Sequence, residues 1–244
     1  MDVSNHVGLS ALLALEKRLS TVAHNVANAS TAGFRSEELR FESLIPDTNT
    51  GTAYASTGQT YLSRATGPIR ATGNPLDIAV KGDYWLAIST PEGTAYTRDG
   101  RLKMEPDGSR KTVSGYPILD VGGAEIQINP NGGPLKIAID GMITQEGRQI
   151  GAVGLFKIPE SANLKRFEAS GVLTETPAEP IVTFTDGGIV QGHVEGANVN
   201  PVSEIMNLIT ITRAFESINA SMKQHADSQK TAIRTIGSNG CRFG

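Results

Sequence analysis

Heptad-spaced apolar residues near both ends of this 244-residue chain constrain its fold more than any other feature. In residues 5–29, apolar side chains recur at alternating spacings of three and four residues, which is the pattern of helices that pack side by side. These positions are Leu12, Leu15, Leu19, Val22 and Val26. The predicted helix ends near Asn28, and both Asn25 and Asn28 are of a residue type that commonly caps helices or forms turns.

A second and longer helical pattern covers residues 201–236. Pro201 suits a first helical position because its missing N–H would have no partner there, and Gly237 is typical of a residue just past a helix end. The expected seam consists of Ile205, Leu208, Thr212, Phe215, Asn219, Met222, Ala226, Gln229, Ile233 and Ile236. A helix of about 36 residues spans roughly 54 Å, so it would extend beyond the first helix.

The residues between the helical patterns read as β structure. Short apolar segments bounded by turn residues predict strands at Leu76–Val80, Tyr84–Ser89, Ala95–Arg98, Lys136–Ile139 and Ile181–Phe184. Asp-Gly or Asn-Gly pairs, which favour the positive φ of hairpin turns, occur at 99–100, 107–108, 131–132, 140–141 and 186–187. Frequent hairpins without intervening helices indicate an antiparallel sheet or barrel. Residues 46–75 show little pattern and are expected to be extended.

These patterns together predict an α+β protein in which an all-β central domain is inserted between terminal helices that pair as a coiled coil. The expected parts are an N-terminal helix at 1–30, an extended connector at 31–75, a β domain at 76–198 and a C-terminal helix at 199–244. Since the two seams differ in length, part of the longer one would stay uncovered in a monomer. Association with other molecules would bury it, which favours a polymerising protein.

Composition excludes several other classes of protein. The net charge is −3, from 22 basic and 25 acidic residues without a long run of either sign, so we expect no nucleic-acid partner and no polybasic membrane anchor. Cys241 is the single cysteine, which rules out an intrachain disulfide. No stretch is apolar for the roughly 18 residues that a membrane span needs. The first residues also lack the basic start of a secretory signal.

Motifs for catalysis are likewise missing from the sequence. There is no Gly-rich phosphate loop, no nucleophile elbow and no pair of histidines at metal-ligand spacing. We therefore expect neither an enzyme nor a cofactor, metal or small-molecule substrate. Glu195 invites a catalytic interpretation, but we expect it to pair or cap nearby, with Asn198 or Asn200 shaping the turn before the second helix. Gly33 and Phe34 suggest a turn and a local packing residue, and Arg98 is expected to cover the sheet.

Three blocks of the sequence resemble the bacterial flagellar basal-body rod protein family, which also includes hook proteins. AHNVANASTAGFR at Ala23–Arg35 resembles the N-terminal signature of that family. LDIAVKGDYWLAISTPEGTAYTRDGRLKMEPDG at Leu76–Gly108 resembles its central β motif, and QGHVEGANVNPVSEIMNLITITRAFESINASMK at Gln191–Lys223 resembles its C-terminal motif. The Trp-Leu-Ala form at 85–87 is similar to proximal-rod members.

The resemblance implies a structural subunit of the flagellar rod in the periplasmic basal body. It would be exported by the flagellar type III apparatus without a cleaved signal peptide, and its partners would be copies of itself, other rod proteins and the export apparatus. The expected assembly interface is Leu12, Leu15, Leu19, Val22, Val26, Asn25, Asn28, Ile205, Leu208, Arg213, Phe215 and Met222. Arg213 joins this set through the resemblance.

Two alternatives stay open at this point. The first is a distal-rod subunit of the same family. The second is a secreted β domain that binds or cleaves glycans with acidic residues such as Asp77 and Asp83, although that interpretation leaves both helical seams without a purpose.

Overall fold

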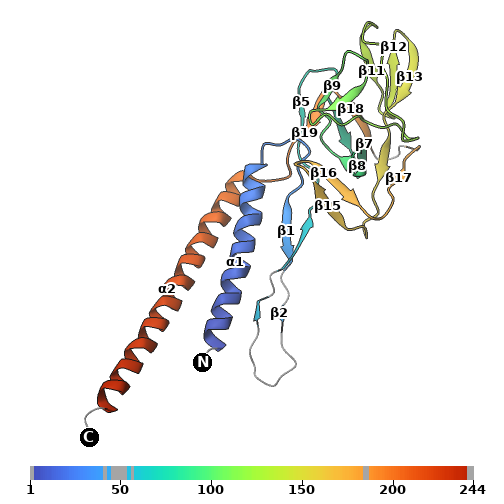
Figure 1. Ribbon diagram of the computed structural model, residues 1–244. Coiled ribbons are helices and arrows are strands. Elements are labelled where there is room, and N and C mark those ends of the chain that lie inside the picture. The colour runs from blue at the N-terminus through green and yellow to red at the C-terminus, as the bar shows by residue number, and fades with distance from the viewer. Residues whose placement is uncertain (1–2, 41–42, 45–53, 56–57, 184–186, 241–244) are drawn as a thin grey trace. The chain divides into compact units, whose positions relative to one another are not determined.

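A computed structural model describes residues 3–40, 43–44, 54–55, 58–183 and 187–240 of the chain. Helix α1 (Val3–Ala27) and helix α2 (Pro201–Gly240) lie at opposite ends of the sequence, with β strands between them (Figure 1). The α+β class and the contact between the terminal helices, both predicted from the sequence, are confirmed. Over the described residues, neither helix carries an apolar run long enough to cross a bilayer.

The chain folds into two compact units, each built from separate segments. Unit 1 contains residues 1–26, 38–60 and 201–244, and unit 2 contains residues 27–37 and 61–200. Part of the stretch predicted as an extended connector, residues 31–37 and 61–75, therefore belongs to the same unit as the central strands.

In unit 1, α1 packs along α2 at close range. A Cβ added to Gly8 would lie 2.9 Å from the Sδ atom of Met222, so the missing side chain of Gly8 lets the two helices approach. The less exposed face of α2 consists of Leu208, Ile211, Phe215, Ile218 and Met222. The residues of this face are also spaced by three and four. The face contains Ile211 and Ile218, whereas the seam predicted from the sequence contains Thr212 and Asn219. Burial of isoleucine is more favourable than burial of threonine or asparagine.

The first ten strands of the chain are short. They are β1 (Glu37–Arg40), β2 (Ser43–Leu44), β3 (Tyr54–Ala55), β4 (Gln59–Leu62), β5 (Ile69–Ala71), β6 (Ile78–Lys81), β7 (Trp85–Thr90), β8 (Gly93–Thr97), β9 (Leu102–Met104) and β10 (Arg110–Thr112). The later strands are β11 (Leu135–Ile137), β12 (Met142–Gln145), β13 (Arg148–Ala152), β14 (Leu155–Lys157), β15 (Leu164–Phe167), β16 (Gly171–Thr174), β17 (Glu179–Pro180), β18 (Gly188–Gln191) and β19 (His193–Glu195).

Antiparallel pairing organises these strands. The largest sheet has the order β15-β16-β8-β7-β14-β17, and a three-stranded sheet has the order β11-β12-β13. The remaining sheets are two-stranded and pair β1 with β4, β2 with β3, β5 with β19, β6 with β18, and β9 with β10. The pairs β5–β19 and β6–β18 join segments that are far apart in sequence, and they bring the residues before α2 back to the start of the β region.

The core of unit 2 lies on both faces of the central strand β7. Side chains alternate across a strand, so Leu86 and Ile88 enter one apolar cluster while Trp85 and Ala87 enter a second. The first cluster includes Ile78, Val80, Leu102, Ile118, Ile143 and Leu155, and the second includes Leu62, Leu119, Phe156, Ile158 and Val172. Burial on both faces explains the nearly continuous apolar run at 84–88.

Several local predictions differ from the structure. Gly237 does not end α2, which continues to Gly240. Gly108 and Gly141 take positive φ between paired strands as expected, but Gly100 does not; it is required because a Cβ there would lie 1.7 Å from the carbonyl oxygen of Ile78. Residues 181–183 form no strand, and the end of that prediction, Phe184, lies outside the described residues, as do most of 41–57 and Asp186.

Candidate functional site

The most unusual feature of unit 2 is a buried charge cluster of Arg35, Arg98 and Glu195. The Glu195 carboxylate accepts hydrogen bonds from Nη2 of Arg35 at 2.9 Å and from Nε of Arg98 at 2.8 Å. Their exposed fractions are 2%, 1% and 1% in the order Arg35, Arg98 and Glu195. Because isolated charges are costly to bury, this carboxylate and its two guanidinium partners depend on one another.

The charges of the cluster do not cancel. Two guanidinium groups share one carboxylate, and both lie over the ring of Trp85, with the Arg35 carbon Cζ at 5.4 Å and that of Arg98 at 5.8 Å from its centroid. An aromatic face attracts such cations. Burial lowers the pKa of Arg35 to about 10 and also lowers the pKa of Arg98, while Glu195 opposes both changes. At this pKa Arg35 is charged at neutral pH, and arginine side chains in general keep their proton in proteins.

Backbone contacts beside the cluster join the segment after α1 to the segment before α2. The Gly33 N–H donates to the Glu195 carbonyl at 2.9 Å, and the Asn198 N–H donates to the Phe34 carbonyl at 3.2 Å. The Asn198 side chain accepts from the Ser36 N–H at 2.6 Å. Glu195 thus forms ion pairs, as expected from the sequence, whereas these hydrogen bonds of Asn198 join it to residues after α1 and not to the turn before α2.

Arg166, from the edge strand β15, holds the same N-terminal segment from another side. Its guanidinium carbon lies 4.5 Å from the centroid of the fully buried Phe34 ring. It donates to the Arg35 carbonyl at 2.6 Å and to the Glu37 carboxylate at 2.5 Å. Residues 33–37 are therefore bound through an aromatic ring, two charged side chains and the backbone.

A third segment, residues 63–67, completes the site. The Ala65 carbonyl accepts from the side chains of Arg35 and Asn198, and the Gly67 N–H donates to the Glu195 carboxylate at 2.9 Å. Arg64 caps the turn at 158–162 by donating to the carbonyls of Ile158, Pro159 and Ala162 at 3.1, 2.8 and 3.0 Å. The cluster thus ties together segments from four regions of the sequence.

Of the cluster residues, Arg98 and Glu195 are singled out by the sequence, but their association is not predicted by it. Arg98 was expected to cover the sheet, whereas its side chain is buried and donates to the carbonyls of Gly82 and Tyr84 as well as to Glu195. Arg35 and Arg166 were not singled out. The available signal was indirect: Arg35, Arg98 and Glu195 each lie inside one of the three family-like blocks. A buried cluster of ion pairs suits a structural role, although Nε of Arg35 and Nη2 of Arg98 have no hydrogen-bond partner in the part of the chain that the structure describes. No cluster of potential metal ligands occurs among the described residues.

The residues predicted for an assembly interface do not form one surface in unit 1. On α1, Val22 and Asn25 are buried, whereas Leu12, Leu15, Leu19 and Val26 are partly exposed. On α2, Leu208, Phe215 and Met222 lie on the inner face, while Ile205 and Arg213 are exposed. Asn28, just after α1, accepts from the hydroxyl of Thr31 at 3.3 Å and so contributes to the turn.

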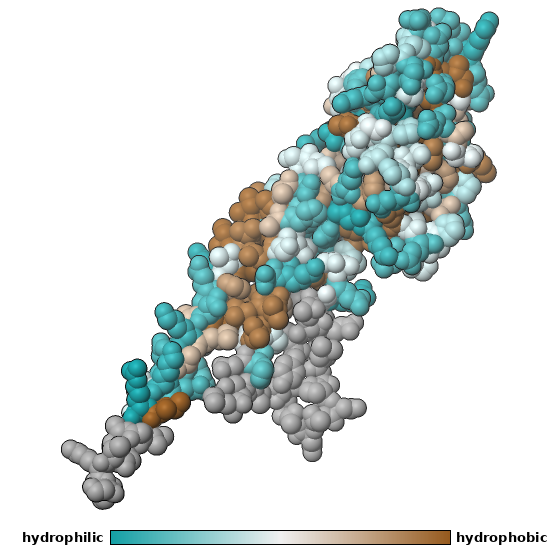
Figure 2. Space-filling view, viewed as in Figure 1, coloured by the Kyte–Doolittle hydropathy of each residue, from teal (hydrophilic) through white to brown (hydrophobic). Residues whose placement is uncertain are grey.

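A second apolar face on α2, the outer face, was missed except for Ile205. It consists of Val202, Ile205, Met206 and Ile209, which are 66%, 47%, 65% and 45% exposed. The spacing i, i+3, i+4, i+7 places them on one side of the helix. Leu9 and Leu13 of α1 are also exposed, and Figure 2 shows apolar side chains gathered along the helices.

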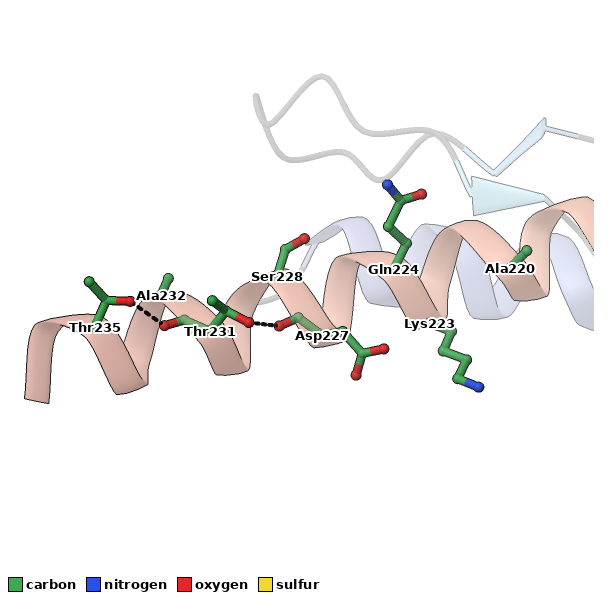
Figure 3. Close-up of a pocket in the computed structure, with 8 residues that line it drawn as sticks. All are labelled: Ala220, Lys223, Gln224, Asp227, Ser228, Thr231, Ala232 and Thr235. Atoms are coloured by element: carbon green, nitrogen blue, oxygen red, sulfur yellow. Dashed lines mark hydrogen bonds between the residues drawn. The ribbon is translucent and has the colours of Figure 1, made fainter. Parts of the chain in front are cut away.

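The C-terminal part of α2 has a different character. Figure 3 shows small, polar and charged side chains along it, from Ala220 to Thr235, with Lys223 pointing away from Gln224 and Ser228. The hydroxyls of Thr231 and Thr235 donate to carbonyls one turn back, at 2.9 Å each. Residues 230–235 are all exposed. Exposed helices of this kind are marginally stable alone.

Comparison with known families identifies the class of protein to which this site belongs. Residues 6–35 match the family described as "Flagella basal body rod protein", residues 79–145 match "Flagellar hook protein FlgE/F/G D1 domain", and residues 190–235 match "Flagellar basal body rod FlgEFG protein C-terminal". The three matches cover the segments that supply Arg35, Arg98 and Glu195. The chain belongs to the flagellar basal-body rod protein family and is a structural rod subunit.

Individual relatives refine this assignment. The flagellar basal-body rod protein FlgF of Mesorhizobium japonicum is 46% identical, over 98% of this chain and 99% of its own length. FlgF of Rhizobium meliloti is 43% identical over 97% and 99%, whereas FlgG of Bacillus subtilis is 29% identical over 88% and 91%. These relatives are structural proteins, and the identities confirm the resemblance to proximal-rod members over the distal-rod alternative. These identities also favour a rod subunit over the glycan-binding domain that was the second alternative from the sequence.

Proposed function

We propose that this subunit polymerises through the outer face of α2, against helices of neighbouring rod subunits. The observation that carries the proposal is the exposure of Val202, Ile205, Met206 and Ile209 on a helix whose opposite side already packs within the monomer. Full burial of such a side chain contributes about 1.5–3 kcal/mol. The four together would offset a substantial part of the entropy lost when subunits associate.

The predicted interface residues divide into two groups under this proposal. Leu208, Phe215, Met222 and Val22 keep α1 and α2 together, so they act on assembly through the shape of unit 1. Ile205 and Arg213, with the remaining partly exposed leucines of α1, contact the neighbour directly. Copies of this chain and other rod proteins are the proposed partners, and the proximal rod within the periplasm is the proposed location.

Export forms the second part of the proposal. A rod subunit assembles outside the cytoplasmic membrane. We therefore assign its passage to the flagellar type III export apparatus, without cleavage. The marginal stability of an exposed helix end favours this route, because a loosely folded terminus is easier to unfold and thread.

Replacement of Met206 by Asp tests the assembly surface. Met206→Asp places a charge in the outer face, and Asn207→Asp adds the same charge at the next, also exposed, position. We expect Met206→Asp to abolish incorporation into isolated basal bodies and motility, while Asn207→Asp supports both. The helical circular dichroism of both purified variants should match that of the unchanged protein.

The fate of the non-assembling variant separates export from assembly. If both proposals hold, Met206→Asp accumulates in the periplasm, because it is exported but not retained in the rod. Normal incorporation of Met206→Asp would refute the assembly surface. Accumulation only in the cytoplasm, with the unchanged protein also confined there when the rod is absent, would refute the export route.

A further inference from the structure

Residues 33–37 occupy an unusual position in the folding of unit 2. They precede every strand of the large sheet, yet they bind Arg166 of β15 and the segment around β19, which holds Glu195 and Asn198. Ser36 and its partner Asn198 are 162 positions apart. Few local contacts hold these residues, so they are placed by parts of the chain that are made much later.

We propose that residues 33–37 are a closing segment, whose docking onto Glu195, Asn198 and Arg166 is required for unit 2 to reach its full stability. Phe34 has no exposed surface in the docked state, and Arg166 covers its ring. Undocking would expose this ring, uncover Trp85 and separate Arg35 from Glu195. Residues 33–37 are thus part of the core of unit 2, and that core is incomplete without them.

The charge cluster makes this closure depend strongly on Glu195. With the carboxylate in place, two buried guanidinium groups share one partner. Without it, the carboxylate of Asp83 is the remaining negative charge that acts on both buried guanidinium groups, and the loss is less favourable than losing one of the two cations. The same carboxylate also accepts from Gly67, so its loss loosens the segment at 63–67 as well.

The consequence deepens the export proposal and rests on it. A chain that passes through an exporter in extended form presents its two ends on the far side at different times. Because closure needs residue 35 and residue 195 together, unit 2 cannot close on the far side until nearly all of it has emerged. The contacts between residues 33–37 and the segment around β19 would then delay the folding of unit 2 until its export is nearly complete.

Hydrogen–deuterium exchange of the purified full chain tests the closing segment without reference to export. The variants are Glu195→Gln and the matched control Glu175→Gln, whose carboxylate forms an exposed pair with Lys165 in the same unit. We expect Glu195→Gln to speed amide exchange by about 100-fold or more, both in residues 27–37 and in the core strands β7 and β8. Glu175→Gln should leave both regions unchanged.

Faster exchange in residues 27–37 alone, with β7 and β8 protected as in the unchanged chain, would overturn the proposal. If Glu195→Gln cannot be purified folded, Arg35→Met takes its place, since Arg98 still balances Glu195 there. It should speed exchange in the same two regions to a smaller degree, and full protection of β7 and β8 in this variant would again overturn the proposal. These exchange measurements use the purified chain, so either outcome holds whether or not cells export the protein through the type III apparatus.

Discussion

The α-carbon of Gly33 faces the backbone nitrogen of Asp99 so closely that an added Cβ would lie 2.3 Å from that nitrogen. Gly33 also has a φ of 68°, in the region that L-residues rarely adopt. The residue that opens the closing segment is thus fixed to glycine by two separate requirements, one local and one tertiary. Gly33 allows Phe34 and Arg35 to enter the site directly beside the end of β8.

Substitution of Gly33 by Ala should therefore destabilise the protein by about 2–4 kcal/mol, from backbone strain together with a backbone clash. Urea unfolding followed by Trp85 fluorescence measures the change. Gly73→Ala is the matched control, because Gly73 has a φ of 73° but nothing within 4 Å of an added Cβ. It should cost only the strain, about 1 kcal/mol. Equal losses in the two variants would show that close approach to Asp99 is unimportant.

Unequal charges in the cluster predict an asymmetry between its members. Glu195→Gln should reduce the free energy of unfolding by about 3–5 kcal/mol, because both guanidinium groups lose their partner. Arg35→Met should cost less, since Glu195 and Arg98 remain paired. The control Glu175→Gln, in an exposed pair, should change stability by about 0.5 kcal/mol or less. A larger loss for Arg35→Met than for Glu195→Gln would contradict this account of the cluster.

The register of α2 gives a prediction for the helical pair. Ile218 lies on the partly buried inner face, whereas its neighbour Asn219 is exposed. Ile218→Ala should lower the free energy of unfolding by about 1–2 kcal/mol, and Asn219→Ala should be nearly neutral. Thermal unfolding followed by circular dichroism at the helical wavelengths compares them. The reverse ranking would support the register first expected from the sequence.

Tyr96 gives the chain a dependence on alkaline pH. Burial raises the pKa of its phenol, which is about 10 in unfolded chains. The folded protein therefore retains this proton at pH values where the unfolded chain has lost it. The contribution to stability is intact below about pH 10 and falls as the pH rises through the higher folded value.

Unfolding free energies at several pH values between neutrality and about pH 11 would test this. Tyr96→Phe should flatten part of the decline. The hydrogen bond to Glu168 also raises the pKa of Tyr116, so some slope remains in that variant. An identical slope with and without the Tyr96 hydroxyl would exclude its contribution.

The outcome for α2 shows the limit of periodicity as a predictor. Both possible seams, one through Ile211 and Ile218 and the other through Thr212 and Asn219, step by three and four residues along the same helix. Periodicity predicted the helix and its start at Pro201, but two adjacent faces fit it equally. Only packing against α1 selected between them, and that choice left Ile205 and Met206 exposed.

The glycine turns illustrate the same division. Asp107-Gly108 and Asp140-Gly141 follow the local rule for hairpins, since their glycines take positive φ. Asp99-Gly100 has the same sequence but serves close backbone approach to Ile78. No local pattern distinguishes these two uses of glycine, because the neighbour that requires it comes from another part of the chain.

By itself the sequence determined the elements: helices at both ends, a turn-rich β region between them, and three blocks typical of a rod subunit. These follow from interactions within a few residues, which spacing and turn chemistry encode directly. Tertiary structure alone decided that Arg35, Arg98 and Glu195 share one buried site. Their partnership depends on strand pairing that folds distant segments together, and the energy of a buried charge is set by whatever surrounds it in space.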